Sequence, residues 1–282
     1  MVCFWHKADI QRTGHNARWP ISLTYSMKND FMSIFDSPYI MFAFALVVQG
    51  LAAYAGDLFQ KKGRPLRKDE RQDFDILRTA SLTLLGLIIG FSFAMAVSRY
   101  DERKKFEVAE ANAIGIEYLR ADLLPSGDAA HVRALLRQYT SQRIIFYLAA
   151  DERRMGQIDA ETKKLQADLW STVVRVATTQ PTPIVALVVS GMNDVLDSQG
   201  YTQAAWRNRI PIAAWALMIL IAIACNLMLG YNERRANWFL LILPFIVSMS
   251  FLLIADIDSP RGGVIRVHGF DLIAQSQSMR PD

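Results

Sequence analysis

Four stretches of the sequence are apolar, uncharged or nearly so, and about as long as a membrane is thick. The hydrocarbon core of a bilayer measures about 30 Å, which a helix rising about 1.5 Å per residue crosses in about 20 residues. The stretches cover about residues 38–55, 79–98, 210–231 and 236–255. A chain with 52% hydrophobic and 21% charged residues fits such spans joined to a water-exposed part. The sequence therefore predicts an all-α integral membrane protein with four transmembrane helices.

The ends and interiors of these stretches fit membrane helices. Asp36 and Ser37 are candidate N-caps of the first stretch, and Pro38 suits a first helical turn. The second stretch contains no charged residue. The fourth contains Pro244 near its middle, which a membrane helix tolerates when neighbouring groups satisfy the carbonyl that a proline leaves unpaired. Because residues 232–235 alone separate the third stretch from the fourth, we expect these two to form a tight antiparallel hairpin.

The second stretch continues into a charged helical segment. Residues 99–124 are rich in Ala, Glu, Arg and Leu, and no helix breaker precedes Pro125. We therefore expect the second membrane helix to run on into water as one long rod. A turn is expected at residues 125–128, and periodicity predicts further helices at 131–150, 158–179 and 185–198.

A further apolar run at residues 184–189 is too short to cross a membrane. We expect it to pack inside the water-exposed segment or to lie at the membrane interface. The sequence thus divides into five parts, which are an N-terminal tail (1–32), a first transmembrane hairpin (33–98), a helical water-exposed segment (99–209), a second transmembrane hairpin (210–256) and a C-terminal tail (257–282).

The N-terminal tail and the orientation of the spans are not decided by residue patterns alone. Residues 1–32 lack the apolar core of a signal peptide. They are either a disordered tail or residues upstream of a translation start at Met27 or Met32. Four spans place both termini and the middle segment on one side. Lys and Arg near the span ends are equally numerous on the two sides, so the positive-inside rule does not choose between them.

Composition and motifs exclude several classes of function. The net charge is +4, but residues 99–209 carry nearly as many acidic as basic side chains, without the basic stripe of a nucleic-acid binder. Cys3 and Cys225 are too few for a zinc site. Catalytic and nucleotide-binding motifs such as the P-loop, HExxH and GxSxG are absent, and the histidines are scattered. We therefore predict no enzyme, no cofactor and no nucleic-acid partner.

Two stripes run along the second stretch. Gly86 and Gly90 form a GxxxG motif, which lets helix backbones approach closely, and Thr79 and Thr83 extend this small, weakly polar stripe. The stripe indicates either helix packing or the lining of a pore or cavity. A second stripe of Leu85, Ile89 and Phe93 recurs every four residues. It indicates either contact with lipid or core, or rings in an oligomer that form a hydrophobic gate.

Charged residues follow the second and fourth stretches. Arg99 lies at an ordinary helix end, or it attracts anions toward a pore mouth. Asp256 and Asp258 are weak candidates for holding a hard cation. We expect these two carboxylates rather to pair with Arg261 or Arg266, or to cap the turn, and we predict no metal site.

Two blocks of sequence resemble a known family. The run SRYDERKKFEVAEANAIGIEYLRADLLP (98–125) and the run ADIDSPRGGVIRV (255–267) are similar to the bestrophin-like family of bacterial and plant membrane proteins of unknown function. In that family these blocks follow the second and fourth spans. The similarity covers about residues 33–267. The family is more distantly similar to bestrophins, which are pentameric anion channels with four spans, a long cytoplasmic helical segment between the second and third, and cytoplasmic termini.

The resemblance implies an orientation and a function. It implies a bacterial inner-membrane protein whose termini and middle segment are cytoplasmic. It also implies a homo-oligomer in the lipid bilayer that conducts chloride or other anions. Leu85, Ile89 and Phe93 would form the pore neck, and Arg99 and Arg103 would concentrate anions at the inner mouth. The alternative is a non-conducting scaffold or sensor whose cytoplasmic helices bind a partner.

Two departures limit the resemblance. Tyr100-Asp101-Glu102-Arg103 is similar to a Tyr-acidic-Arg-Trp-like run of bestrophins, but Lys104 and Lys105 stand where the tryptophans would be. The acidic cluster that binds calcium in animal bestrophins is not reproduced either, which argues against gating by calcium.

Overall fold

The computed structural model describes residues 37–62, 67–149, 154–232 and 238–279, so the predicted tail at 1–32 lies outside the described residues. All regular structure in these ranges is helical, which confirms the all-α class. The elements are α2 (Pro38–Lys62), α3 (Lys68–Arg120), η1 (Ala121–Leu123), α4 (Ser126–Leu148), α5 (Met155–Thr179), α6 (Pro183–Arg207), α7 (Ile212–Asn232), η3 (Trp238–Leu241), α8 (Ile242–Asp258) and α9 (Phe270–Ser278).

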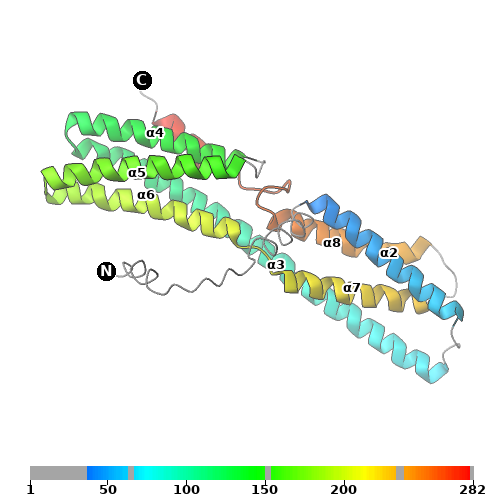
Figure 1. Cartoon of the computed structure of the whole chain (residues 1–282). Coiled ribbons are helices and arrows are strands. Elements are labelled where there is room, and N and C mark those ends of the chain that lie inside the picture. The colour runs from blue at the N-terminus through cyan, green and yellow to red at the C-terminus, as the bar shows by residue number, and fades with distance from the viewer. Residues whose placement is uncertain (1–36, 63–66, 150–153, 233–237, 280–282) are drawn as a thin grey trace, which may run out of the picture.

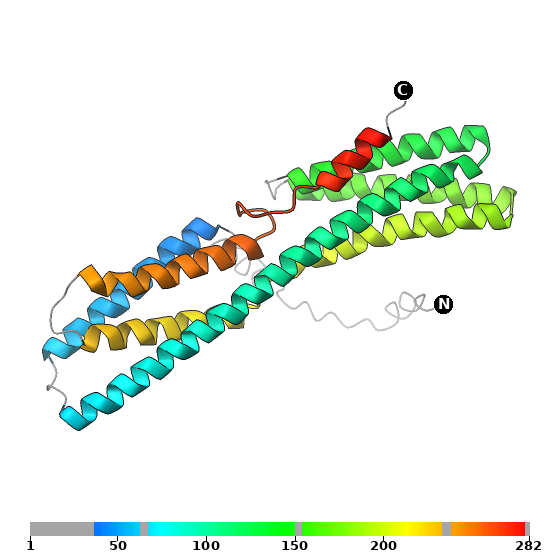
Figure 2. The same cartoon turned by 180° about the vertical axis from the view of Figure 1, so that it is seen from behind.

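The molecule is elongated and consists of two helical bundles that share α3 (Figures 1 and 2). We call the first the apolar bundle; it contains α2, the first half of α3, α7 and α8, and its core is built around Met41, Leu85, Met218 and Phe251. We call the second the polar bundle; it contains the second half of α3, η1, α4, α5, α6 and α9, and its core is built around Ile114, Leu136, Leu169 and Val188. Each bundle therefore has its own hydrophobic core.

Helix α3 is one unbroken helix of 53 residues, as the sequence predicted. It begins after Arg67, whose backbone N–H donates to a carboxylate oxygen of Glu70 at 2.8 Å. At about 1.5 Å per residue it is about 80 Å long. The predicted turn at 125–128 is shorter than expected, because α4 already begins at Ser126. Pro125 precedes this first residue, where its fixed φ and missing N–H disturb no helical hydrogen bond.

In the apolar bundle, helices that follow each other in sequence are not the ones that pack together. Helix α2 packs against α7 and α8, and α3 packs against the other sides of the same two helices, while α2 and α3 are not in substantial contact. Gly56 and Gly230 explain the close approach of α2 to α7. A Cβ atom added to Gly56 would overlap the backbone of Leu227, and one added to Gly230 would overlap the carbonyl oxygen of Ala53. The two helices of the first predicted hairpin, α2 and α3, are thus neighbours in sequence but do not pack against each other.

Hydrogen bonds inside the apolar bundle also hold α2 in place. The Gln49 amide nitrogen donates to the Ser248 hydroxyl at 3.2 Å, and the Asn226 amide nitrogen donates to the Gln49 amide oxygen at 3.0 Å. All three side chains are buried and come from α2, α8 and α7. Polar groups bonded in this way between helices stabilise bundles that lack water inside.

Three segments are long and apolar enough to cross a membrane within the described ranges, namely Pro38–Lys62, Glu70–Leu123 and Pro183–Tyr231. The fourth predicted stretch is shorter as an α-helix than expected, because α8 begins at Ile242 after the 3-10 turn η3. Pro244 therefore lies in the first turn of α8 and not in the middle of a helix, and a proline in this position removes no intrahelical hydrogen bond.

The C-terminal part of the polar bundle differs most from expectation. Helix α6 starts where the Thr182 hydroxyl accepts the N–H of Val185, and it runs to Arg207, beyond the predicted end at Ser198. In the run at 184–189, Val185 and Val188 pack inward, which was one of the two predicted alternatives, while Ile184 and Leu187 are exposed. The predicted tail contains α9, which no sequence pattern indicated and which packs on α3 and α4.

Candidate functional site

One face of α3 in the apolar bundle contacts no other part of the described chain. Apart from the adjoining backbone of α3 itself, no heavy atom of the described chain lies within 4 Å of a Cβ atom built on Gly86 or Gly90, and Thr79 and Thr83 are exposed. A shallow apolar groove on this side is lined by residues of α3 alone. We call the surface formed by Thr79, Thr83, Gly86, Gly90 and Phe93 the bare face. Within the described part of one chain Gly86 and Gly90 pack against no helix, so their packing role remains a prediction that requires a second copy.

The three residues predicted to line a pore lie in different surroundings. Leu85 is 2% exposed and belongs to the core of the apolar bundle, Ile89 is half-buried against that core, and Phe93 is 38% exposed. The cause is helical geometry, because a step of four residues turns about 40° beyond one full turn. Two such steps carry the stripe from the core to the surface. Of the three, only Phe93 faces clearly outward.

Arg103 lies at the junction of the two bundles and not at an open mouth. It is 2% exposed and donates only to backbone carbonyls in the described part of the chain. The acceptors lie at the C-terminal ends of α6 and α8, and they are Ala205, Asn208, Ile257 and Asp258, at 2.9–3.4 Å. Burial lowers the pKa of Arg103. The guanidinium thus satisfies the unpaired carbonyls of two helix ends, a structural role that the sequence did not predict.

The two aspartates in the last turn of α8, Asp256 and Asp258, also have bonding partners within the chain. Asp258 pairs with Arg99 at 3.4 Å, and its two oxygens accept the N–H of Ile210 at 3.2 and 3.0 Å. Asp256 accepts the N–H groups of Val264 and Ile265 at 2.8 and 2.9 Å. Asp256 thus caps the turn after α8, which was one of the expected roles. Asp258 instead binds the segment before α7, and its ionic partner is Arg99 and not the expected Arg261 or Arg266. Among the described residues no group of three His, Cys, Asp or Glu could hold a metal ion.

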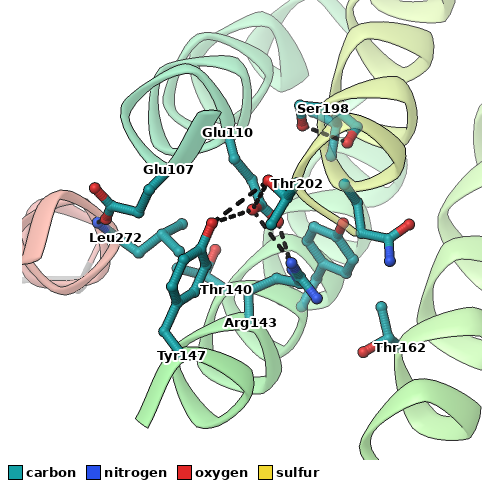
Figure 3. A network of polar contacts seen from close by, with 12 residues as sticks. Glu107, Glu110, Thr140, Arg143, Tyr147, Thr162, Ser198, Thr202 and Leu272 are labelled. Atoms are coloured by element: carbon teal, nitrogen blue, oxygen red, sulfur yellow. Dashed lines mark hydrogen bonds and ion pairs between the residues drawn. The ribbon is translucent and has the colours of Figure 1, made fainter. Parts of the chain in front are cut away.

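A network of buried polar side chains lies in the polar bundle (Figure 3). The Glu110 carboxylate of α3 pairs with the Arg143 guanidinium of α4 and accepts hydrogen bonds from Tyr147 at 3.1 Å and Thr202 at 3.0 Å. Arg143 also lies over the ring of Phe146, at 4.3 Å from the ring centre. Burial alone would lower the pKa of Arg143, but the adjacent Glu110 carboxylate raises it. Glu110 thereby connects α3, α4 and α6.

Glu107, one turn before Glu110, holds the C-terminal helix. Its carboxylate accepts the backbone N–H groups of Asp271 and Leu272 at 3.0 and 3.1 Å, and so caps the first turn of α9 (Figure 3). Burial raises the pKa of Glu107 to about 7. Gly269, which precedes α9, has φ of 71°, a left-handed conformation that favours glycine.

Glu117 is fully buried, and neither carboxylate oxygen has a hydrogen-bond partner among the described residues. The nearest cation is Arg120, at 4.0 Å. Across the interface lies Gly191 of α6, where a Cβ atom would overlap a Glu117 oxygen. Burial raises the pKa of Glu117 to about 8; Arg120 opposes this shift and Asp194 adds to it. The absence of a side chain at Gly191 thus provides the space that this carboxyl group occupies.

Replacing Glu117 with glutamine is expected to reduce the dependence of stability on pH. A carboxyl whose folded pKa exceeds its unfolded value binds its proton more tightly in the folded state. The stability that this carboxyl group contributes is fully present below the ordinary glutamate pKa and is lost as pH rises through about 8. The thermal midpoint of the wild type should therefore fall between about pH 6 and about pH 9 more steeply than that of Glu117→Gln. Glu102→Gln, at an exposed position on the same helix, should behave like the wild type.

The sequence contained a signal for these buried charges. Arg103, Glu107, Glu110, Ile114 and Glu117 follow one another at alternating steps of four and three, which place them on one face of a helix. This face continues the buried side of the span before it. The charge of these residues suggested exposure to solvent, whereas their spacing indicated a helix face that packs against other helices.

Comparison with known proteins gives one family and one fold. A family model described as a Bestrophin-like domain matches residues 78–269. A variant of a bacterial Bestrophin homolog from Klebsiella pneumoniae has a TM-score of 0.58 at 15% identity, covering 84% of this chain and 95% of that chain. Another crystal structure of a Klebsiella pneumoniae homolog gives 0.56 at 13% identity, covering 86% and 95%. At such identities the structures establish a shared fold. No curated protein matches the chain.

Proposed function

Because the chain belongs to the bestrophin-like family, we propose that it is an integral membrane protein whose copies assemble around a pore for small anions such as chloride. Helices α2, α3 and α7 supply three spans. Helix α8 has 17 residues and supplies the fourth together with η3, since spans of about 17–25 residues occur in membranes. In this arrangement the polar bundle and both termini lie on the cytoplasmic side of a bacterial inner membrane.

The observation that carries the proposal is the bare face of α3. Glycines and threonines on a membrane helix allow another backbone to approach closely, yet no described helix of the same chain does so at Gly86 and Gly90. A second copy can. Identical subunits commonly close into rings with rotational symmetry, which brings the same helix of every copy to one axis. In this arrangement α3 lines the pore along its whole apolar half.

The constriction follows from what the bare face presents. Leu85 is in the core of its own subunit, so we assign the narrowest ring to Phe93, with Ile89 beside it and Gly86 and Gly90 forming the wall. A ring of apolar side chains excludes water and ions until it widens.

The cation at the inner mouth is assigned to Lys104. Arg103 is buried and Arg99 pairs with Asp258, so neither is placed to receive anions from water. Lys104 is exposed and lies five turns beyond Gly86 at about 3.6 residues per turn, which puts it on the same side of α3. A cluster of such lysines, one from each subunit, raises the local concentration of anions.

Purified protein in chloride-loaded liposomes tests the proposal. We expect flux above that of empty vesicles, and Phe93→Ala should raise the flux about tenfold, which corresponds to removing about 1.4 kcal/mol of barrier. Lys104→Gln should lower the preference for chloride over cations. Leu217→Ala, at an exposed position on α7, is the matched control and should leave the flux unchanged.

Silence of both the wild type and Phe93→Ala in this assay would refute conduction. The alternative is then a non-conducting scaffold or sensor whose polar bundle binds a partner. Exposed apolar side chains near the end of α3 and on α6, among them Ile116, Leu119 and Leu187, favour it as the second candidate.

A further inference from the structure

The loop after α8 is folded back against the helix that it leaves. The two oxygens of Asp256 hold the backbone N–H groups of Val264 and Ile265 at 2.8 and 2.9 Å. Gly263 allows this turn, because a Cβ atom there would overlap the carbonyl oxygen of Asp256. The side chains of Val264 and Ile265 point outward and are 70% and 39% exposed. These hydrogen bonds thus present an apolar pair to the surroundings.

This apolar pair closes one end of a groove on the outer side of α8. The groove has a volume of about 580 Å³ and is lined mainly by apolar side chains from three segments. Among the lining residues are Tyr39 of α2, Ile246, Met249 and Leu253 of α8, and Val264 and Ile265 of the loop. A cavity of this size and lining fits part of a hydrocarbon chain.

The position of the groove points to a lipid as its occupant. The groove is continuous with the exposed apolar side of α8, which faces the hydrocarbon if α8 spans the membrane as proposed above. The loop lies at the end of α8 next to the polar bundle (Figure 2). In the proposed arrangement this end of α8 is the boundary between hydrocarbon and water. Tyr39 is exposed at the same end, as tyrosines at membrane interfaces are.

The charge beside the apolar pair fits the headgroup of an anionic lipid. Arg266 follows Ile265 directly and donates through Nη1 to the carbonyl oxygen of Arg261 at 3.3 Å. Its remaining guanidinium nitrogens form no further hydrogen bond or ion pair with the described residues. A guanidinium group can bind a phosphate through two parallel N–H donors, and the remaining nitrogens of Arg266 can serve in this way.

We propose that Val264 and Ile265 insert into the membrane boundary, and that the groove beside them holds an acyl chain of a phospholipid whose phosphate meets Arg266. Asp256 is then a positioning residue, because it fixes the loop that carries both the apolar pair and the arginine. The inference rests on the proposed membrane span of α8, but it does not depend on conduction.

Photocrosslinking of the full chain separates the inference from the proposal on which it rests. A benzophenone side chain replaces Val264, Ile246 or Leu119 in turn, and each variant is reconstituted in vesicles of phosphatidylcholine and phosphatidylglycerol. Ile246 is on the outer side of α8, and Leu119 is an exposed position in the polar bundle. We expect lipid adducts at positions 264 and 246 at least about tenfold above those at 119, since only the first two lie in the membrane boundary or below it.

Each of the other possible crosslinking results leads to a different conclusion. Lipid adducts at 246 but not at 264 would overturn the inference and leave the span of α8 standing. Lipid adducts at neither position would overturn the span itself. A crosslink from 264 to a second copy of the chain would show that protein and not lipid fills the groove.

The headgroup contact has a separate test. Arg266→Gln should reduce the preference for phosphatidylglycerol over phosphatidylcholine among adducts at position 264 about fivefold, as expected for one basic group near an anionic surface. Arg175→Gln, an exposed arginine of the polar bundle, should leave this preference unchanged. An unchanged preference in Arg266→Gln, or equal displacement of both lipids by inorganic phosphate, would overturn the assignment of Arg266 to a lipid headgroup.

Discussion

Replacing Arg143 with methionine is expected to destabilise the folded chain by about 3–5 kcal/mol. Arg143 and Glu110 are both fully buried, and the substitution leaves the Glu110 carboxylate in the core without its ionic partner. Tyr147 and Thr202 would still donate to the carboxylate, but two neutral donors do not replace a cation. Methionine keeps much of the packing over Phe146, so the loss reports mainly on the charge. Denaturant unfolding in detergent, followed by tryptophan fluorescence, measures it.

A double variant and an exposed control show whether the loss of stability comes from the unpaired buried charge. Adding Glu110→Gln to Arg143→Met should recover a large part of the lost stability, because a buried pair replaced on both sides leaves no unpaired charge. Arg175→Met removes an exposed pair with Asp128 of 2.8 Å and should cost less than about 1 kcal/mol. A cost of that small size for Arg143→Met would contradict the view that the buried ion pair of Arg143 and Glu110 stabilises the polar bundle.

The same substitution, glycine to alanine, is expected to have opposite effects at Gly230 and at Gly86. Alanine is favoured over glycine inside a helix by about 1 kcal/mol, so Gly86→Ala, where nothing lies within 4 Å, should stabilise the isolated subunit slightly. At Gly230 the new methyl group would overlap the Ala53 carbonyl, and the backbones of α2 and α7 would have to separate. We expect Gly230→Ala to cost about 3 kcal/mol, at the upper end of the range for overpacking.

Thermal unfolding of both variants in detergent checks this reversal of sign. Gly56→Ala should resemble Gly230→Ala, because a Cβ atom at Gly56 would overlap the backbone of Leu227 in the same interface. Equal midpoints for Gly230→Ala and Gly86→Ala would contradict the packing of α2 against α7. A loss of oligomer in Gly86→Ala with an intact subunit would support the proposed assembly around the bare face.

Helices were predictable from the sequence because their causes are local. The rod of α3 follows from the absence of proline between its start and Pro125, and the end of α5 at Thr179 follows from Pro181 and Pro183. The pairing of α2 with α7 was not predictable in this way. It depends on Gly56 and Gly230 meeting across more than a hundred residues of sequence, and no local pattern relates two such glycines.

The candidate site shows the same division. Helical spacing placed Gly86 and Gly90 on one stripe and Phe93 on another, but it did not tell which stripe members face outward, and Leu85 of the second stripe is buried. Arg103 was assigned to a pore mouth on the strength of its charge, whereas its carbonyl partners come from the ends of α6 and α8. Helix α9 was missed because its first turn is capped by Glu107, a residue far away in the chain.

The continuity of α3 has a mechanical consequence. Its two halves belong to different bundles, and Arg103 ties the ends of α6 and α8 to the helix where the bundles meet. A twist of one bundle relative to the other about the helix axis would strain the backbone hydrogen bonds of α3, and each one that broke would cost about 1 kcal/mol net. The two bundles therefore resist independent rotation. A rotation of the polar bundle would therefore be transmitted along α3 to the bare face.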